Sequence, residues 1–97
     1  GRGSEQQGIR PALVVQNDIG NEYAATTIVA AITTTIKLYP VTFALEKGEG
    51  GLPRRSMVNL AQVLTIDKHR LLRKLGTLPA EKEGRLNNAL KISLALG

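Results

Sequence analysis

Arg10 is the residue whose type and position best suit it to bind a phosphate group. It precedes Pro11, and the residue before a proline is restricted to an extended backbone, so its side chain leaves the chain at a defined point. A guanidinium keeps its charge and presents planar, forked donors that match phosphate oxygens. A surface arginine in an ion pair is the commoner alternative, and the residue type leaves both interpretations open.

Three threonines in a row are a second candidate group. Thr33, Thr34 and Thr35 end a β-branched run that begins at Thr26. A hydroxyl at the end of a strand can contact a phosphate or a base edge, and strand alternation predicts Thr33 and Thr35 on one face and Thr34 on the other. Threonine is also common in strands because it fits a pleated surface, so composition alone assigns no role.

A polar, glycine-rich segment opens the chain as GSEQQG, residues 3–8, with hydrogen-bonding groups on Ser4, Glu5 and Gln6. It has neither the Walker spacing nor the GxGxxG order of phosphate-binding loops. Such a loop can wrap a polar ligand, but its composition fits an exposed hairpin tip equally well.

The histidine and cysteine content narrows the chemistry. The chain has no cysteine and a single histidine, His69, which excludes disulfides and makes an imidazole metal site within one chain unfavourable. A paired-imidazole acid–base mechanism is excluded for the same reason. The acidic residues show no paired spacing for a carboxylate metal site. We therefore expect no metal ion and no cofactor.

The net charge of +5 is concentrated in the second half of the chain. Residues 51–97 carry nine Lys or Arg against three acidic residues, whereas residues 1–50 carry four against five. A basic half is typical of nucleic-acid binding, although a solvated surface explains it as well. No apolar run is long enough to span a membrane and no signal-like segment opens the sequence. We expect a cytoplasmic protein.

Short strands must position these residues. The pattern predicts strands at residues 12–16, 26–35, 41–45 and 56–64. Turn residues fill 17–21, and a glycine-containing loop tip spans 47–53. In the last strand, alternation predicts Asn59 and Ala61 on one face and Gln62 on the other.

Two helices are expected after the strands. The first begins at Thr65 or Asp67 and ends at Leu75 before Gly76, in the usual terminating place. The second runs over residues 79–96, with an apolar stripe that includes Leu86, Leu90 and Leu94. The 97 residues form one domain. This order indicates an α+β fold, a small antiparallel sheet or partial barrel with helices packed at one side.

GSEQQGIRPALVVQN, residues 3–17, resembles the opening motif of the MazF/PemK toxin family, GSEQ-G--RP-LV-QN. Further segments resemble later parts of the family in the same order, namely TTIVAAITT, KLYPVTFAL, GLPRRSMVNLAQVLTIDKHRL and NNALKISLAL. The resemblance covers nearly the whole chain, which we treat as one MazF-like domain over residues 1–97. The family's first strand, a segment like RGDV(Y/F)-DL-P, should precede Gly1. We expect either a longer protein or a sheet lacking that strand.

The resemblance implies a twisted antiparallel β-barrel with a short helix and a C-terminal helix, and a homodimer. It implies a toxin that cuts single-stranded RNA at short sequences without a metal ion. Its expected partner is a MazE-type antitoxin that lays a disordered tail across the RNA groove.

The family's functional residues carry over by motif. Three positions match catalytic residues, namely Arg10, Thr33 and Glu5. Four further positions match RNA contacts, namely Ser4, Gln6, Thr34 and Gln62. The family's usual glutamate and arginine in the last strand are replaced by Ala61 and Leu64 here, which indicates a different cleavage sequence.

Metal-independent cleavage uses the 2′-hydroxyl of RNA as nucleophile, so we expect a 2′,3′-cyclic phosphate and a 5′-hydroxyl, with activity unchanged in EDTA. Arg10 would stabilise the charge that develops on the phosphorane. Thr33 would hold a non-bridging oxygen, and Glu5 would act as the base or orient Arg10. Two alternatives stay open: a CcdB-like toxin of similar fold that binds gyrase without chemistry, and a plain nucleic-acid-binding module.

Overall fold

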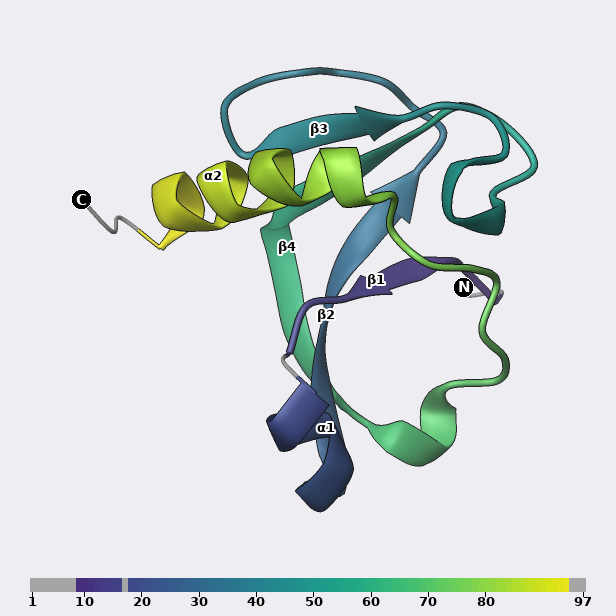
Figure 1. Ribbon diagram of the computed structural model, residues 1–97, viewed down its shortest axis with the longest axis vertical. Helices are drawn as coiled ribbons and strands as arrows, with labels where there is room; N and C mark the ends of the chain where they lie inside the picture. The colour runs from purple at the N-terminus through teal and green to yellow at the C-terminus, as the bar shows by residue number, and fades with distance from the viewer. Residues whose placement is uncertain (1–8, 17, 95–97) are drawn as a thin grey trace, which may run out of the picture.

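The computed structural model describes residues 9–16 and 18–94. Four strands form one antiparallel sheet in the order β1-β2-β4-β3, with a short helix between β1 and β2 and a longer helix after β4 (Figure 1). The elements are β1 (Ala12–Val14), α1 (Asp18–Tyr23), β2 (Thr26–Thr33), β3 (Thr42–Leu45), β4 (Ser56–Asp67) and α2 (Glu83–Ser93). The predicted α+β class with a small antiparallel sheet and a C-terminal helix is therefore confirmed.

β4 is the longest strand and bends in the middle, which curls the sheet (Figure 1). Its first five residues are buried, and the five that follow are exposed. Along β2, Ala30 lies opposite Val63 but the next residue, Ala31, lies opposite Asn59. Residues 60–62 of β4 therefore lie between two consecutive pairs with β2, where the register shifts. An insertion of this kind bends a strand and increases its twist.

The bend breaks the alternation predicted for residues 56–64, because residues 56–60 are buried on both faces. Polar groups at the bend of β4 form hydrogen bonds. The Leu60 amide donates to the Val41 carbonyl at 2.8 Å. The Asn59 side-chain oxygen accepts from the Ala61 amide at 2.9 Å. Two backbone amides at the bend are thus hydrogen-bonded outside the regular ladder.

The core lies between the bent sheet and α2, which packs against β3 and β4 (Figure 1). Its buried members are Ala30, Phe43, Leu45, Leu52, Val58, Leu60 and Ala89. From the predicted stripe of the C-terminal helix, Leu86 and Leu90 pack against this core, whereas Leu94 is 60% exposed just past the helix end. The Ser93 hydroxyl donates to the Leu60 carbonyl at 2.7 Å and fixes that end of α2 on the bend.

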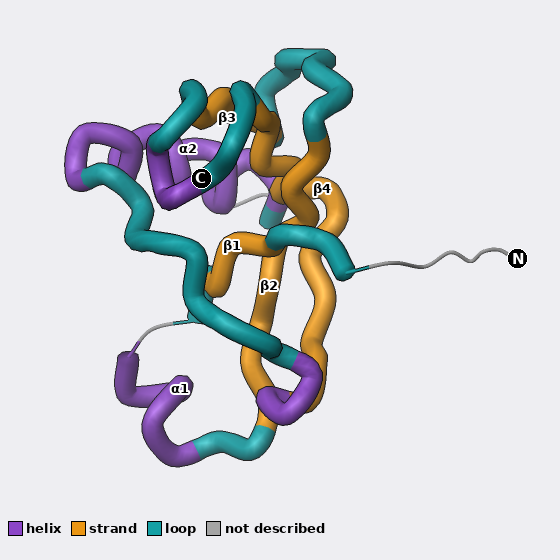
Figure 2. The backbone as a smooth tube through the Cα atoms, turned by 90° about the vertical axis from the view of Figure 1, so that its right-hand side faces the viewer, coloured by secondary structure: helices purple, strands orange, loops and turns teal. Residues whose placement is uncertain are grey.

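The helix predicted over 65–75 is wrong. β4 continues to Asp67 because its last three residues pair with residues 26–28 of β2. This pairing satisfies backbone groups that a helix would have had to satisfy within itself, so tertiary context overrides the local pattern. A single 3-10 turn, Lys68–Arg70, follows, and Figure 2 shows the long loop that leads from it towards α2.

Other predicted boundaries shift. Helix α1 occupies part of the predicted turn at 17–21, and strand β2 ends at Thr33 instead of residue 35. The second helix begins at Glu83 because a 3-10 turn fills Ala80–Lys82 first. Within the described residues, no helix combines the length and apolar character that crossing a membrane would require.

Gly76, predicted to end a helix, has a packing role instead. A Cβ on Gly76 would lie 2.5 Å from the carbonyl carbon of Gly50, and one on Gly51 would lie 2.0 Å from the carbonyl oxygen of Leu75. Gly51 also has a left-handed φ of 75°, which residues with a Cβ rarely adopt. The two loops therefore meet backbone to backbone.

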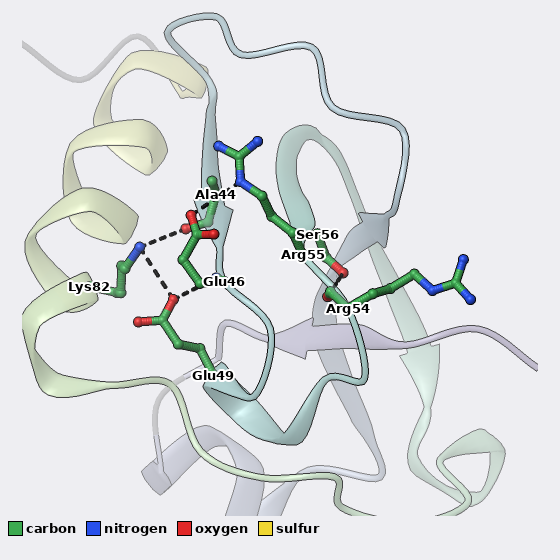
Figure 3. A network of polar contacts seen from close by, with 7 residues as sticks. All are labelled: Ala44, Glu46, Glu49, Arg54, Arg55, Ser56 and Lys82. Carbon is green, nitrogen blue, oxygen red and sulfur yellow. Dashed lines mark hydrogen bonds and ion pairs between the residues drawn. The ribbon is translucent and has the colours of Figure 1, made fainter.

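The loop between β3 and β4 is held by an ionic network (Figure 3). Arg55 Nε lies 3.1 Å from Glu46 Oε2, and Lys82 Nζ lies 3.4 Å from Glu49 Oε1. Lys82 also donates to the Ala44 carbonyl at 2.9 Å. The Glu46 amide donates to Glu49 Oε1 at 2.7 Å. The hydrogen bond from the Glu46 amide and the neighbouring Lys82 ammonium both lower the pKa of Glu49.

Substitution of Gly51 by Ala tests the contact between the two loops. The added Cβ would clash with backbone atoms of Leu75, and the left-handed φ is itself unfavourable for alanine. We therefore expect the free energy of unfolding to fall by about 2 kcal/mol or more. Gly84→Ala is the control, because a Cβ there meets open space in α2, and it should stabilise by about 0.5–1 kcal/mol. Equal effects in urea titrations would contradict the packing described.

The lowered pKa of Glu49 predicts how stability depends on pH. A carboxyl with a depressed pKa contributes stability above its unfolded pKa, about 4.3, and this contribution is lost as the pH falls through the folded value. Glu49→Gln should therefore destabilise the chain at pH 7, and its difference from wild type should shrink in acid. Glu22→Gln, at an exposed site, should show little difference at either pH. A Glu49→Gln deficit that stays constant down to pH 3 would refute this role.

Candidate active site

A cavity of about 180 Å³ lies where β1 begins and β2 ends. Its lining residues are Arg10, Pro11, Ile32, Thr33, Thr34 and Ser56. Three residues predicted from the sequence, Arg10, Thr33 and Thr34, are therefore brought together at one place. They come from segments more than twenty positions apart in the chain.

The sheet register places Arg10 beside Thr33. β1 and β2 are antiparallel, with Ala12 opposite Ala31. Arg10 lies two residues before Ala12, and Thr33 lies two residues after Ala31. If the register is continued past the start of β1, Arg10 is opposite Thr33. The side chain of Arg10 is exposed at this point, so its guanidinium can reach a ligand in the cavity while its backbone is set by Pro11.

The hydroxyl of Thr33 is held by the end of its strand. Its Oγ1 accepts a hydrogen bond from the Thr35 amide at 3.1 Å, and the residue is half-buried. Because β2 stops at Thr33 and the chain then bends, the predicted alternation does not continue. Thr34 consequently lines the same cavity as Thr33 instead of lying on the opposite face.

Ser56 also lines the cavity, and no sequence pattern indicated this position. It begins β4, next to Met57, which pairs with Thr33. Its side chain is buried, with 3% of its surface exposed, and its hydroxyl donates to the Arg54 carbonyl at 2.9 Å (Figure 3). Only the pairing of β4 with β2 brings Ser56 to the cavity, and nothing in its local sequence distinguishes it from other serines at strand starts.

The remaining predicted residues are not part of this cavity's described lining. Gln62 is exposed and lies in the bend of β4. Ser4, Glu5 and Gln6 fall outside the described residues, so their predicted roles stay predictions.

The cavity suits an anion. Among the described residues that line it there is one permanent cation, Arg10, together with hydroxyl groups and no carboxylate. Within the same part of the chain, no three His, Cys, Asp or Glu side chains gather in a way that could hold a metal ion. A cation with adjacent hydroxyls can bind a phosphodiester and stabilise added negative charge on it.

A larger cavity, of about 280 Å³, lies between α2 and β3 and holds none of the predicted site residues. Its lining residues are Leu38, Pro40, Thr42, Phe43, Ala44, Arg85, Asn88 and Ala89. An arginine, Arg85, also lines this cavity, together with one hydroxyl-bearing residue, Thr42, so size alone does not mark the reactive site. The smaller cavity is better suited to bind a phosphate, because its arginine lies beside three residues that carry hydroxyl groups.

Comparison with known proteins identifies the family of the chain. Residues 1–94 match the family model described as PemK-like, MazF-like toxin of type II toxin–antitoxin system. Endoribonuclease MazF of Staphylococcus saprophyticus is 46% identical over 97 residues, covering 98% of this chain and 81% of that protein. Endoribonuclease EndoA of Bacillus subtilis is 47% identical over 96 residues, covering 97% and 83%.

Solved structures agree as well. Mycobacterium tuberculosis toxin MazF-mt6 superposes with a TM-score of 0.85 at 27% identity, covering 91% of this chain and 88% of that one. A mycobacterial endoribonuclease in complex with its cognate antitoxin also gives 0.85, at 26% identity, covering 97% and 88%. The curled sheet and C-terminal helix are thus shared, and the chain belongs to the PemK-like, MazF-like family of toxins of type II toxin–antitoxin systems.

Proposed function

We propose that this endoribonuclease toxin cuts single-stranded RNA in the cavity beside Arg10, without a metal ion and with the 2′-hydroxyl of RNA as nucleophile. The observation that carries the proposal is the meeting of Arg10 with the hydroxyls of Thr33, Thr34 and Ser56 around one anion-sized cavity. Its close relatives are endoribonucleases by name, which favours the nuclease over the gyrase-binding alternative.

Arg10 acts on the charge of the transition state. Attack by the 2′-oxygen on phosphorus adds negative charge to the non-bridging oxygens, and a fixed guanidinium stabilises that charge more than the charge of the ground state. A guanidinium offers hydrogen-bond donors and no acceptor, so it is poorly suited to take a proton. We therefore assign it charge stabilisation and leave the 2′-proton to another group.

Thr33 positions the phosphate. Its Oγ1 already accepts the Thr35 amide, which leaves the hydroxyl hydrogen free to donate to a non-bridging oxygen. Thr34, exposed at the rim of the cavity, would contact the same strand of RNA. Glu5 is proposed as the base that takes the 2′-proton or as the residue that orients Arg10, and Ser4, Gln6 and Gln62 as further RNA contacts.

Partners follow from the family. One mycobacterial structural neighbour is described with its cognate antitoxin, and we propose that a MazE-type antitoxin neutralises this chain by covering the RNA groove. We also propose that the toxin is a homodimer. We propose that it acts in the cytoplasm, the compartment in which it would encounter RNA and the antitoxin.

Arg10→Ala tests the proposal directly. Removal of one preorganised charge-stabilising group typically lowers kcat by about 10²–10³, whereas RNA affinity should fall by no more than about tenfold. Cleavage of a long single-stranded RNA and binding to an uncleavable analogue measure the two effects separately.

Arg73→Ala is the matched control for Arg10→Ala, because it removes an exposed arginine from the loop after β4. It should leave kcat near the wild-type value. If cleavage and affinity fell in parallel for Arg10→Ala, a plain binding module would explain the data better. Inactivation of the wild type by EDTA would exclude the metal-independent mechanism.

Thr33→Val tests the hydroxyl while keeping the β-branched shape. We expect kcat to fall by about tenfold to a hundredfold, and Thr33→Ser to recover most of the rate because it restores the donor. Single-turnover cleavage rates provide the measurement, and thermal unfolding reports whether loss of the Thr35 contact unfolds the strand end. A folded Thr33→Val variant with unchanged kcat would remove Thr33 from the mechanism.

A further inference from the structure

We infer that Arg54 is an RNA-binding residue that contacts a phosphate next to the one held at Arg10. The inference rests on the proposed function and extends its site along the RNA backbone. It assigns to Arg54 a role in binding and not in the chemical step.

The backbone at Arg54 is tied to the cavity through Ser56. The Ser56 side chain lines the cavity with Arg10 and Thr33, and its hydroxyl donates to the Arg54 carbonyl at 2.9 Å. This bond fixes the residue that lies two positions before the strand. Because Ser56 lines the cavity, this bond holds the backbone of Arg54 next to it.

The two neighbouring arginines diverge. Arg55 turns to Glu46, with 3.1 Å between Nε and Oε2, whereas Figure 3 shows Arg54 extending away from that pair, on the side towards which the Ser56 hydroxyl points. Arg54 is exposed, and among the described residues its side chain forms no ion pair.

This division assigns different tasks to residues of the same type. The charge of Arg55 is already balanced by Glu46, and their pair ties the ends of the loop between β3 and β4 together. Arg54 has no ion pair among the described residues, and its forked donors lie beside a cavity that suits a phosphodiester. A single strand of RNA carries a phosphate at every nucleotide, so binding one phosphate at Arg10 brings the next ones to the surface around it. Arg54 is the arginine directed there.

The test compares Arg54→Gln with Arg55→Gln, which remove the same charge from adjacent positions. The probe is a single-stranded RNA with 2′-O-methyl groups throughout, which binds but lacks the nucleophile. Each phosphate contact on a single strand contributes about 0.7 to the slope of log affinity against log salt. Arg54→Gln should reduce the slope by about 0.7 and weaken binding about eightfold near 0.05 M salt.

Arg55→Gln should keep the wild-type slope, and Arg54→Lys should keep most of it because the charge remains. With unmodified RNA, Arg54→Gln should raise KM and leave kcat unchanged. A wild-type slope for folded Arg54→Gln, or an equal loss for Arg55→Gln, would overturn the inference while wild-type cleavage continues. If the wild type left unmodified RNA intact, the proposed function would fail, and the inference with it.

Discussion

The structure depends on the antiparallel register of β2 between β1 and β4. On one side the register sets Arg10 level with Thr33, and on the other it sets Thr33 against Met57, beside Ser56. A slip by one residue would turn each side chain to the opposite face of the sheet. The cavity therefore exists because three strands agree in register at one corner of the sheet.

The bend divides β4 into a half that belongs to the core and a half that is exposed. The first half of β4 is buried under α2, and the second half is exposed where it pairs with the start of β2. Core residues and exposed strand surface are thus divided along one strand. Ser93, which donates to Leu60 at the bend, couples the helix to the point at which the division occurs.

The sequence predicted the strands because alternation and β-branched runs are local signals, whereas the joint role of Arg10 and Thr33 was implied only by the family resemblance. It failed at residues 65–75, where a plausible capping and leucine pattern was overridden by pairing with residues 26–28. It also missed Ser56, whose place in the cavity depends entirely on which strand lies beside β2. Local patterns could be predicted from the sequence, whereas contacts between segments distant in the sequence could not.

We propose above all that RNA is cut at this cavity by its own 2′-hydroxyl, with Arg10 and the neighbouring hydroxyls acting on the phosphate and no metal ion taking part. The most direct measurement is the chemistry of the ends produced from one defined transcript in EDTA. The account predicts a 2′,3′-cyclic phosphate on the upstream fragment and a 5′-hydroxyl on the downstream fragment. A 3′-hydroxyl with a 5′-phosphate would contradict it, because water and not the 2′-oxygen would then be the nucleophile.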